Sequence, residues 1–156
     1  MKPALQAALQ PAFDRRFLLR ASAAASAALW LPSAQACEFF SRTLRVYHPW
    51  TRATPQNAAF AVVSMKFDQV EVTDRLIGVE TPVASGAEMG GRGAKSAVDL
   101  AIPAGEETTL GEMGTTLRLV GLKQALELGR SYPLKLIFER GGVLNTTLQV
   151  DYARFG

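Results

Sequence analysis

The sequence has very little of the residue types that build disulfides and many metal or catalytic sites. Its 156 residues contain one cysteine and one histidine. A single cysteine excludes an internal disulfide and a zinc site made of several cysteines. A single histidine, His48, excludes a cage of several imidazoles and is the only one that a Ser-His-Asp triad could use. No nucleophile elbow, metal-hydrolase motif or phosphate loop is present either, so we expect no enzyme.

An excess of charge of one sign is also missing from most of the chain. The formal charge is +3, but residues 1–36 hold four basic and one acidic side chain, which gives +3 by itself (4 − 1). Residues 37–156 hold 13 basic and 13 acidic side chains and are neutral overall. Nucleic-acid binders neutralise phosphates with an excess of Lys and Arg, so the balance argues against such a partner.

The first 36 residues have the pattern of a bacterial export signal. Arg15 and Arg16 form a twin-arginine pair, an Ala-rich apolar stretch follows, and Ala34 and Ala36 supply the small residues of an A-x-A cleavage site. The apolar stretch is shorter than the roughly 20 residues of a membrane-spanning helix. We predict a twin-arginine-type signal peptide over residues 1–36; the alternative is an N-terminal amphipathic or anchor helix.

The only cysteine, Cys37, directly follows the predicted cleavage site. A cysteine at this place can become the lipid-modified first residue of an exported protein, although Ala34 stands where leucine is usual in that motif. The alternative is an unmodified thiol near the mature N-terminus. Both interpretations place the protein in the periplasm, with membrane contact only through the signal or a lipid on Cys37.

From residue 42 onward, apolar and polar residues alternate in short runs, as in strands with one buried face. Turn-forming residues separate the runs, and Gly141-Gly142 is expected to join the last two strands as a hairpin. About seven short strands in this length predict an all-β, antiparallel sandwich over residues 44–152, after a lead of residues 37–43. The alternating residues are Leu44, Val46, His48, Ala61, Val63, Met65, Phe67, Leu76, Ile77, Val79, Val98, Leu100, Ile102, Leu117, Leu119, Tyr132, Leu134, Leu136, Phe138, Leu144, Thr146, Leu148, Val150 and Tyr152.

One segment, Thr81–Ala97, breaks this pattern. It contains four glycines and lacks alternation. Seventeen residues (97 − 81 + 1) is long for a connection, so we expect either a functional loop or a mobile one.

Short motifs in this region resemble, in the same order, those of the periplasmic copper chaperone family PCuAC. Each motif is weak alone, but the collinear set covers roughly residues 44–151. The motifs are His48–Pro55, Asn57–Phe60, Asp74–Val79, Thr81–Ala84, Ile102–Gly105, Gly121–Leu126 with Gly129, and Leu134–Gly141. The resemblance implies a cupredoxin-like β-sandwich and the handling of copper(I).

The family binds Cu(I) through soft histidine and methionine donors, ending in a His-x-Met triplet. Alignment of the motifs places Gly90 at the first histidine, Thr116 at the second histidine and Arg118 at the second methionine. The first methionine has no counterpart, because Gly90 and Thr116 are closer in sequence than the family pattern requires. All four ligands are therefore absent, and Arg118 adds a cation that repels a metal ion.

Three residues could still supply soft donors. Met89 precedes the first vacated position, Met113 lies shortly before the second, and His48 could add an imidazole from the opening strand. The alternative for each methionine is packing, since methionine often fills gaps. His48 and Trp50 flank Pro49 and form either a binding ledge or the packed end of the sandwich. Arg52 is expected to pair with an acidic residue such as Glu88.

Two functions are consistent with these residues. The first is an exported copper chaperone-like domain with weakened or lost Cu(I) binding, whose partner would be a periplasmic copper-site assembly factor or acceptor protein. The alternative is a metal-free periplasmic interaction or adaptor protein on the same sandwich.

Overall fold

The computed structural model describes residues 37–92 and 94–152, and these residues form strands and turns without a helix. None of them belongs to a helix long and apolar enough to cross a membrane. Ten strands follow one another along the chain. They are β1 (Glu38–Phe40), β2 (Arg45–Thr51), β3 (Phe60–Asp68), β4 (Asp74–Glu80), β5 (Ala84–Gly91), β6 (Leu100–Ile102), β7 (Thr108–Leu110), β8 (Thr115–Leu122), β9 (Ser131–Phe138) and β10 (Gly142–Val150).

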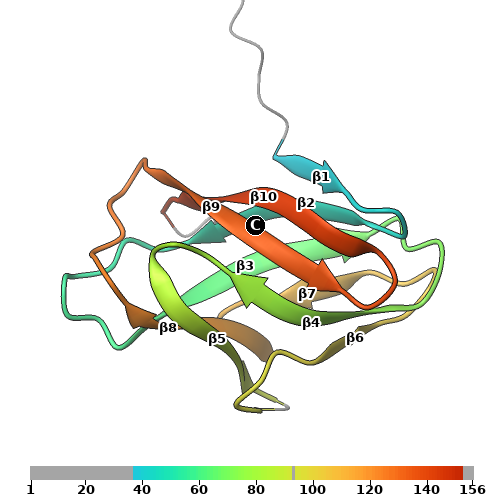
Figure 1. Ribbon diagram of the computed structural model, residues 1–156, viewed down its shortest axis with the longest axis horizontal. Coiled ribbons are helices and arrows are strands. Elements are labelled where there is room, and N and C mark those ends of the chain that lie inside the picture. Colours follow the sequence, from blue (N-terminus) through green and yellow to red (C-terminus); the bar gives the residue numbers. More distant parts are fainter. Residues whose placement is uncertain (1–36, 93, 153–156) are drawn as a thin grey trace, which may run out of the picture. The chain divides into compact units, whose positions relative to one another are not determined.

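The strands form one strongly curled sheet with the order β5, β8, β3, β2, β10, β9, β4, β6, while β1 pairs with β2 and β7 pairs with β3. In Figure 1 the layer that contains β4, β9 and β10 lies in front of the layer that contains β3 and β8. The two layers enclose the core, and Phe67 of β3 meets Phe138 of β9 edge-to-face across it. The predicted all-β, cupredoxin-like sandwich is thus confirmed.

Most pairings are antiparallel, as predicted, but the β2–β10 pairing is parallel. It places a strand from the start of the domain beside the last strand. The predicted hairpin between β9 and β10 is confirmed, and Gly142 adopts a φ of +75° in its turn, a conformation that glycine adopts without strain.

The segment Thr81–Ala97 is not the long loop that its composition suggested. It contains β5, which pairs with β8 over its whole length. The predicted lead of residues 37–43 likewise contains a strand, β1. Two residues of the expected core are exposed. Ile77 lies at a register shift between Leu76 and Gly78, which turns its side chain outward, and Tyr152 follows the last strand.

Asp74 at the start of β4 ties three parts of the sandwich together. Its buried carboxylate accepts hydrogen bonds from the Thr43 hydroxyl at 2.6 Å and from the backbone N–H groups of Arg75, Arg140 and Gly141 at 2.7–2.8 Å. Burial alone would raise the pKa of Asp74, but the four hydrogen bonds stabilise the charged form and the net effect is a lowered pKa.

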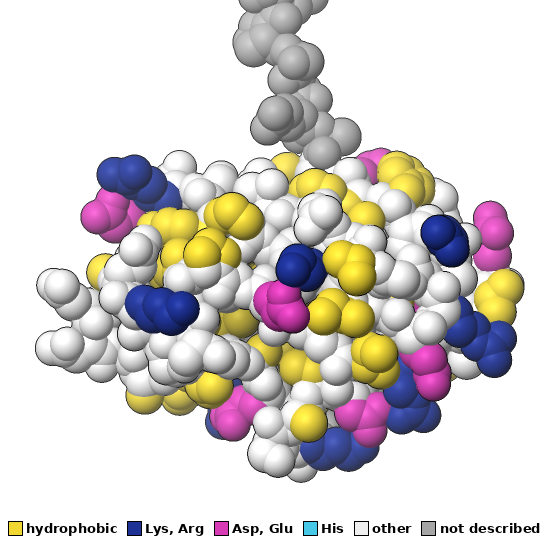
Figure 2. Space-filling view, in the orientation of Figure 1, with side chains coloured by type: hydrophobic (Ala, Val, Ile, Leu, Met, Phe, Trp, Pro, Cys, Tyr) yellow, Lys and Arg dark blue, Asp and Glu magenta, His cyan; other side chains and the backbone are white. Residues whose placement is uncertain are grey.

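Among the residues that the structure describes, the face seen in Figure 2 carries no single large apolar patch. Figure 2 shows apolar side chains scattered among Lys or Arg side chains that lie next to Asp or Glu. This arrangement agrees with the neutral charge of residues 37–156 and with ion pairs such as Lys135–Glu80.

Candidate functional site

The antiparallel pairing of β5 with β8 brings the predicted ligand positions together. Gly90 lies opposite Thr116, and Glu88 lies opposite Arg118. Alternate residues of a strand point to opposite faces, and the neighbours Met89 and Leu117 are buried in the core. Gly90, Thr116 and Arg118 therefore share the outer face of the sheet. The register proposed from the motifs places three of the family's four ligand positions in one cluster.

Arg118 fills the space above Gly90. A Cβ atom built on Gly90 would lie 2.7 Å from Nε and 2.9 Å from Cζ of Arg118, and it would also collide with Oγ1 of Thr116. Gly90 does not have a positive φ, so the requirement for glycine comes from this close approach and not from the backbone conformation. The guanidinium thus occupies the space that a side chain at position 90, the predicted counterpart of the family's first histidine, would need.

The guanidinium of Arg118 is held by stacking on an aromatic ring and by close packing more than by hydrogen bonds. Its Cζ lies 4.8 Å from the ring centroid of Phe60, a cation–π distance. Its nearest carboxylate is Glu88, at 3.9 Å. Within residues 37–92 and 94–152, neither the buried Nε of Arg118 nor the buried Oγ1 of Thr116 has a hydrogen-bond partner.

Arg45 is a useful comparison, because its guanidinium is paired with a carboxylate. Arg45 donates two hydrogen bonds to Asp68, both of 2.7 Å. The hydrogen bonds from Arg45 are the largest cause of the lowered pKa of Asp68, against a smaller opposing effect of burial. The same contact raises the pKa of Arg45. Arg118 has no comparable acceptor among the residues that the structure describes.

The two candidate methionines do not meet. Met89 is 3% exposed and belongs to the core cluster, whereas Met113 is 92% exposed in the turn before β8. A thioether in the core and one in solvent do not form a common ligand pair. The described residues also contain no group of three or more His, Cys, Asp or Glu side chains that could hold a metal ion. The side chains present at the cluster therefore do not fit Cu(I).

His48 lies in β2 where the pairing with β3 shifts register between Tyr47 and Trp50. Its φ is +47°, its side chain is 8% exposed, and its backbone N–H donates to the Cys37 carbonyl at 2.6 Å. The imidazole is therefore packed at a β-bulge instead of projecting as an open ledge.

The targeting residues fall mostly outside the structure. Arg15, Arg16, Ala34 and Ala36 lie outside the described residues. Cys37 is partly exposed, and its sulfur accepts a hydrogen bond from Nε2 of Gln149 at 3.0 Å. Both twin-arginine export and lipid modification stay predictions.

The expected pair of Arg52 with Glu88 does not form. Arg52 instead forms a two-point ion pair with Glu112 in the turn after β7. Hydrogen bonding to Glu112 is the largest cause of the raised pKa of Arg52, opposed by a smaller effect of burial. Sequence patterns offer no means of choosing between these acidic partners, because the choice depends on where the turn before β8 lies.

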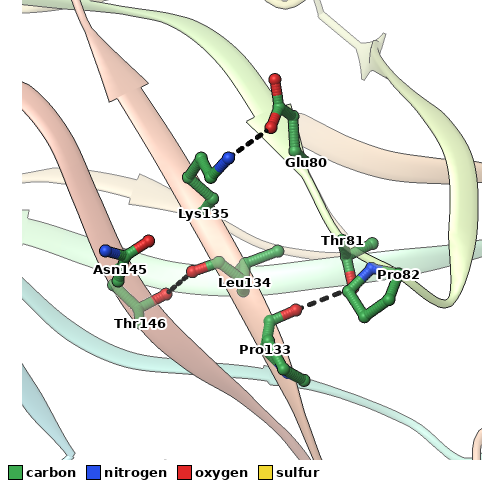
Figure 3. A pocket seen from close by; sticks show the side chains of 8 residues that line it. All are labelled: Glu80, Thr81, Pro82, Pro133, Leu134, Lys135, Asn145 and Thr146. Atoms are coloured by element: carbon green, nitrogen blue, oxygen red, sulfur yellow. Dashed lines mark hydrogen bonds and ion pairs between the residues drawn. The ribbon is translucent and has the colours of Figure 1, made fainter.

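A groove of about 300 Å³ lies at the other layer, between the end of β4, the first half of β9 and the middle of β10. Figure 3 shows four of its polar side chains engaged with neighbours: Lys135 with Glu80, Thr81 with the Pro133 carbonyl and Thr146 with the Leu134 carbonyl, each at 2.8 Å. Because these groups are already paired, the groove is a weaker candidate site than the cluster around Arg118.

Comparisons with known proteins agree with this fold. Residues 44–150 match the LpqE-like family, described as "Putative lipoprotein LpqE-like". No curated protein matches the sequence. A copper-bound PCuAC domain from PmoF2 is 22% identical with a TM-score of 0.67, and the match covers 74% of this chain and 98% of that domain.

Two further structures are similar. The apo PCuAC domain from PmoF1 is 24% identical with a TM-score of 0.67, over 74% of this chain and 99% of that domain. The Cu(I) form of DR1885 from Deinococcus radiodurans is 25% identical with a TM-score of 0.61, over 76% of this chain and 81% of that protein. The predicted resemblance to PCuAC is confirmed: the chain belongs to the LpqE-like family, and its β-sandwich is that of the PCuAC copper chaperone-like domains.

Proposed function

We propose that this protein is an exported binding protein that has the copper chaperone-like sandwich but works without Cu(I) at the family's ligand positions. The observation that carries the proposal is the guanidinium of Arg118 above Gly90. Of the two functions that the sequence left open, the metal-free interaction protein is the one that this geometry favours.

The physical reason is the loss of donors combined with a fixed positive charge. Cu(I) prefers thioether and imidazole ligands, and the cluster offers a hydroxyl and a guanidinium instead. A unit charge about 4 Å from a cation costs about 4 kcal/mol near a protein surface. Two of the similar structures hold copper, but a fold shared at 22–25% identity does not carry the ligands with it.

The absence of the catalytic motifs sought in the sequence supports a binding role over an enzymatic one. The partner would be another exported protein, such as a copper-site assembly factor on which the domain docks. Export to the periplasm is supported by the pattern of residues 1–36 and by the lipoprotein description of the family. Cys37 is the residue that would carry the lipid.

Competition with a chromogenic Cu(I) chelator tests the loss of copper binding. We expect the wild type to withdraw no copper from the chelator, and the variant M89L/M113L to behave identically. The variant G90H/T116H/R118M restores three of the family's ligands and serves as the positive control, with its folding checked by circular dichroism. Withdrawal of copper by the wild type that disappears in M89L/M113L would establish the residual copper chaperone instead.

Mass spectrometry of the protein purified from the membrane, periplasmic and cytoplasmic fractions tests the location. A mature chain that begins at Cys37 with the mass of an acyl modification is the expected result for a lipoprotein. An unmodified chain in the periplasm supports export without a lipid, and an uncleaved cytoplasmic chain contradicts export.

A further inference from the structure

Arg118 and Arg45 are both partly buried, but their hydrogen-bond donors differ in the acceptors available to them. Arg45 donates two hydrogen bonds to Asp68 and pairs with Glu38 at 3.2 Å, whereas Arg118 has only Glu88, at 3.9 Å and without a hydrogen bond, among the described residues. A guanidinium is a planar fork whose donors match the two oxygens of a carboxylate. The Nε of Arg118 is buried, so the donors available to an acceptor from outside the described chain are those of its two terminal Nη groups.

The surroundings of Arg118 hold the guanidinium in place before any ligand arrives. Phe60 stacks on it at 4.8 Å, Gly90 lies beneath it, and Thr116 is 4% exposed beside it. A side chain that is already immobilised loses little conformational entropy on binding, and partial burial strengthens its electrostatic interactions. These are the features of a preorganised anion site.

The surface next to the guanidinium is apolar. The Phe60 side chain is 44% exposed, and the Arg118 side chain is 37% exposed. Phe60 pairs with Val120, and Val62 pairs with Arg118, so apolar residues of β3 and β8 adjoin the charge on the outer face. An aromatic ring beside an accessible arginine is the composition that dominates binding energy in protein interfaces.

We propose that the outer face of β3, β8 and β5 is a binding site for a carboxylate attached to an apolar group, with Arg118 as the residue that binds the carboxylate and Phe60 as the apolar contact. A small organic acid and the C-terminal carboxylate of a protein both have this chemistry. The proposal rests on the proposed function in one respect, namely that Arg118 rather than Cu(I) occupies the cluster.

Nuclear magnetic resonance of the ¹⁵N-labelled protein tests the site directly. The Nε–H signal of Arg118 is observed, assigned by its absence in R118M, and followed during titration at constant ionic strength. The probes are N-acetylphenylalanine and its amide, which differ in the carboxylate alone. We expect a saturable shift of this signal with the acid and none with the amide.

Two variants check that the shift reports binding at this arginine. R118K keeps the charge but loses the planar fork, and we expect binding weaker on the order of tenfold. R130M is the matched control, because Arg130 is exposed and already paired with Glu127 at 2.9 Å; it should bind as the wild type does. The comparison of acid and amide is made on the wild type and needs R118M only for the assignment, so it stands even where R118K or R130M unfolds.

A peptide that ends in phenylalanine with a free carboxylate distinguishes the two sources. Binding roughly tenfold or more tighter than that of N-acetylphenylalanine assigns the site to a protein C-terminus, and equal binding assigns it to a small acid. An Arg118 signal that responds equally to acid, amide and chloride, or to none of them, overturns the proposal. That result leaves the copper competition unaffected, so the two proposals fail separately.

Discussion

The Asp74 carboxylate accepts a hydrogen bond from the Gly141 N–H at 2.8 Å and so joins the start of β4 to the turn between β9 and β10. A Cβ atom on Gly141 would lie 3.0 Å from the same carboxylate and 2.8 Å from the Thr43 hydroxyl. The glycine is needed because the turn approaches the carboxylate so closely. Asp74 and Gly141, which both belong to the PCuAC-like motifs, thus have a structural role that is separate from the cluster on β5 and β8.

Asp74→Ala should destabilise the sandwich by about 3 kcal/mol or more, because it leaves several buried donors without an acceptor. Asp74→Asn should cost less. Its amide keeps one oxygen for two donors and places an NH₂ group opposite the Gly141 N–H, where a second donor is unfavourable. Urea unfolding monitored by fluorescence measures both. Glu106→Gln, at an exposed carboxylate between β6 and β7, is the comparison expected to change stability least.

The stability of the wild type should fall as the pH drops below about 4. Asp74 has a lowered pKa in the folded protein, so it contributes stability above the pKa of the unfolded chain, about 3.9, and that contribution is lost as the pH falls through the folded pKa. Denaturant midpoints between pH 7 and pH 2.5 measure the slope. The slope should be shallower in Asp74→Asn, and identical slopes would show that other carboxylates dominate.

Gly90→Ala should destabilise the protein by about 1–3 kcal/mol, because the added methyl group meets Arg118 and Thr116. Gly86→Ala is the matched control in the same strand, since its Cβ would make an ordinary 3.6 Å contact with Val120. The double variant G90A/R118M should be more stable than the sum of the single changes predicts. Strict additivity in thermal unfolding would mean that the guanidinium does not lie above Gly90.

Truncation of Met89 and truncation of Met113 should change the stability of the protein to very different extents. Met89→Ala removes a core side chain and should cost about 2–5 kcal/mol. Met113→Ala changes an exposed side chain and should stay within about 0.5 kcal/mol. Differential scanning calorimetry compares them. A large loss for Met113→Ala would show that its turn packs more tightly than its exposure indicates.

Alternation predicted most of the strands because one face of each is buried in the core. It failed for β5, where Gly86, Gly90 and Gly91 interrupt the apolar signal even though Met89 is buried. Gly90 and Gly91 reflect the close approach of β8 and of the turn before it, and not a loop. A single-sequence pattern does not distinguish a glycine that is flexible from a glycine that is crowded.

The parallel pairing of β2 with β10 was not predictable for a different reason. It joins residues from opposite ends of the domain, such as Trp50 and Gln149, and nothing in either strand's own sequence specifies the other. The same holds for the ion pair between Arg52 and Glu112. The positions of Gly90, Thr116 and Arg118 were predicted, but their mutual contacts depend on the β5–β8 register, which only the structure gives.

The short distance between Cys37 and the sheet has a consequence for a lipidated form. β1 begins at Glu38 and pairs at once with Tyr47 of β2. Each free residue of a tether adds at most about 3.5 Å of reach. An acyl chain on Cys37 would therefore be joined to the sheet by almost no flexible linker. The domain would lie close to the bilayer surface and adopt few orientations relative to its neighbours there.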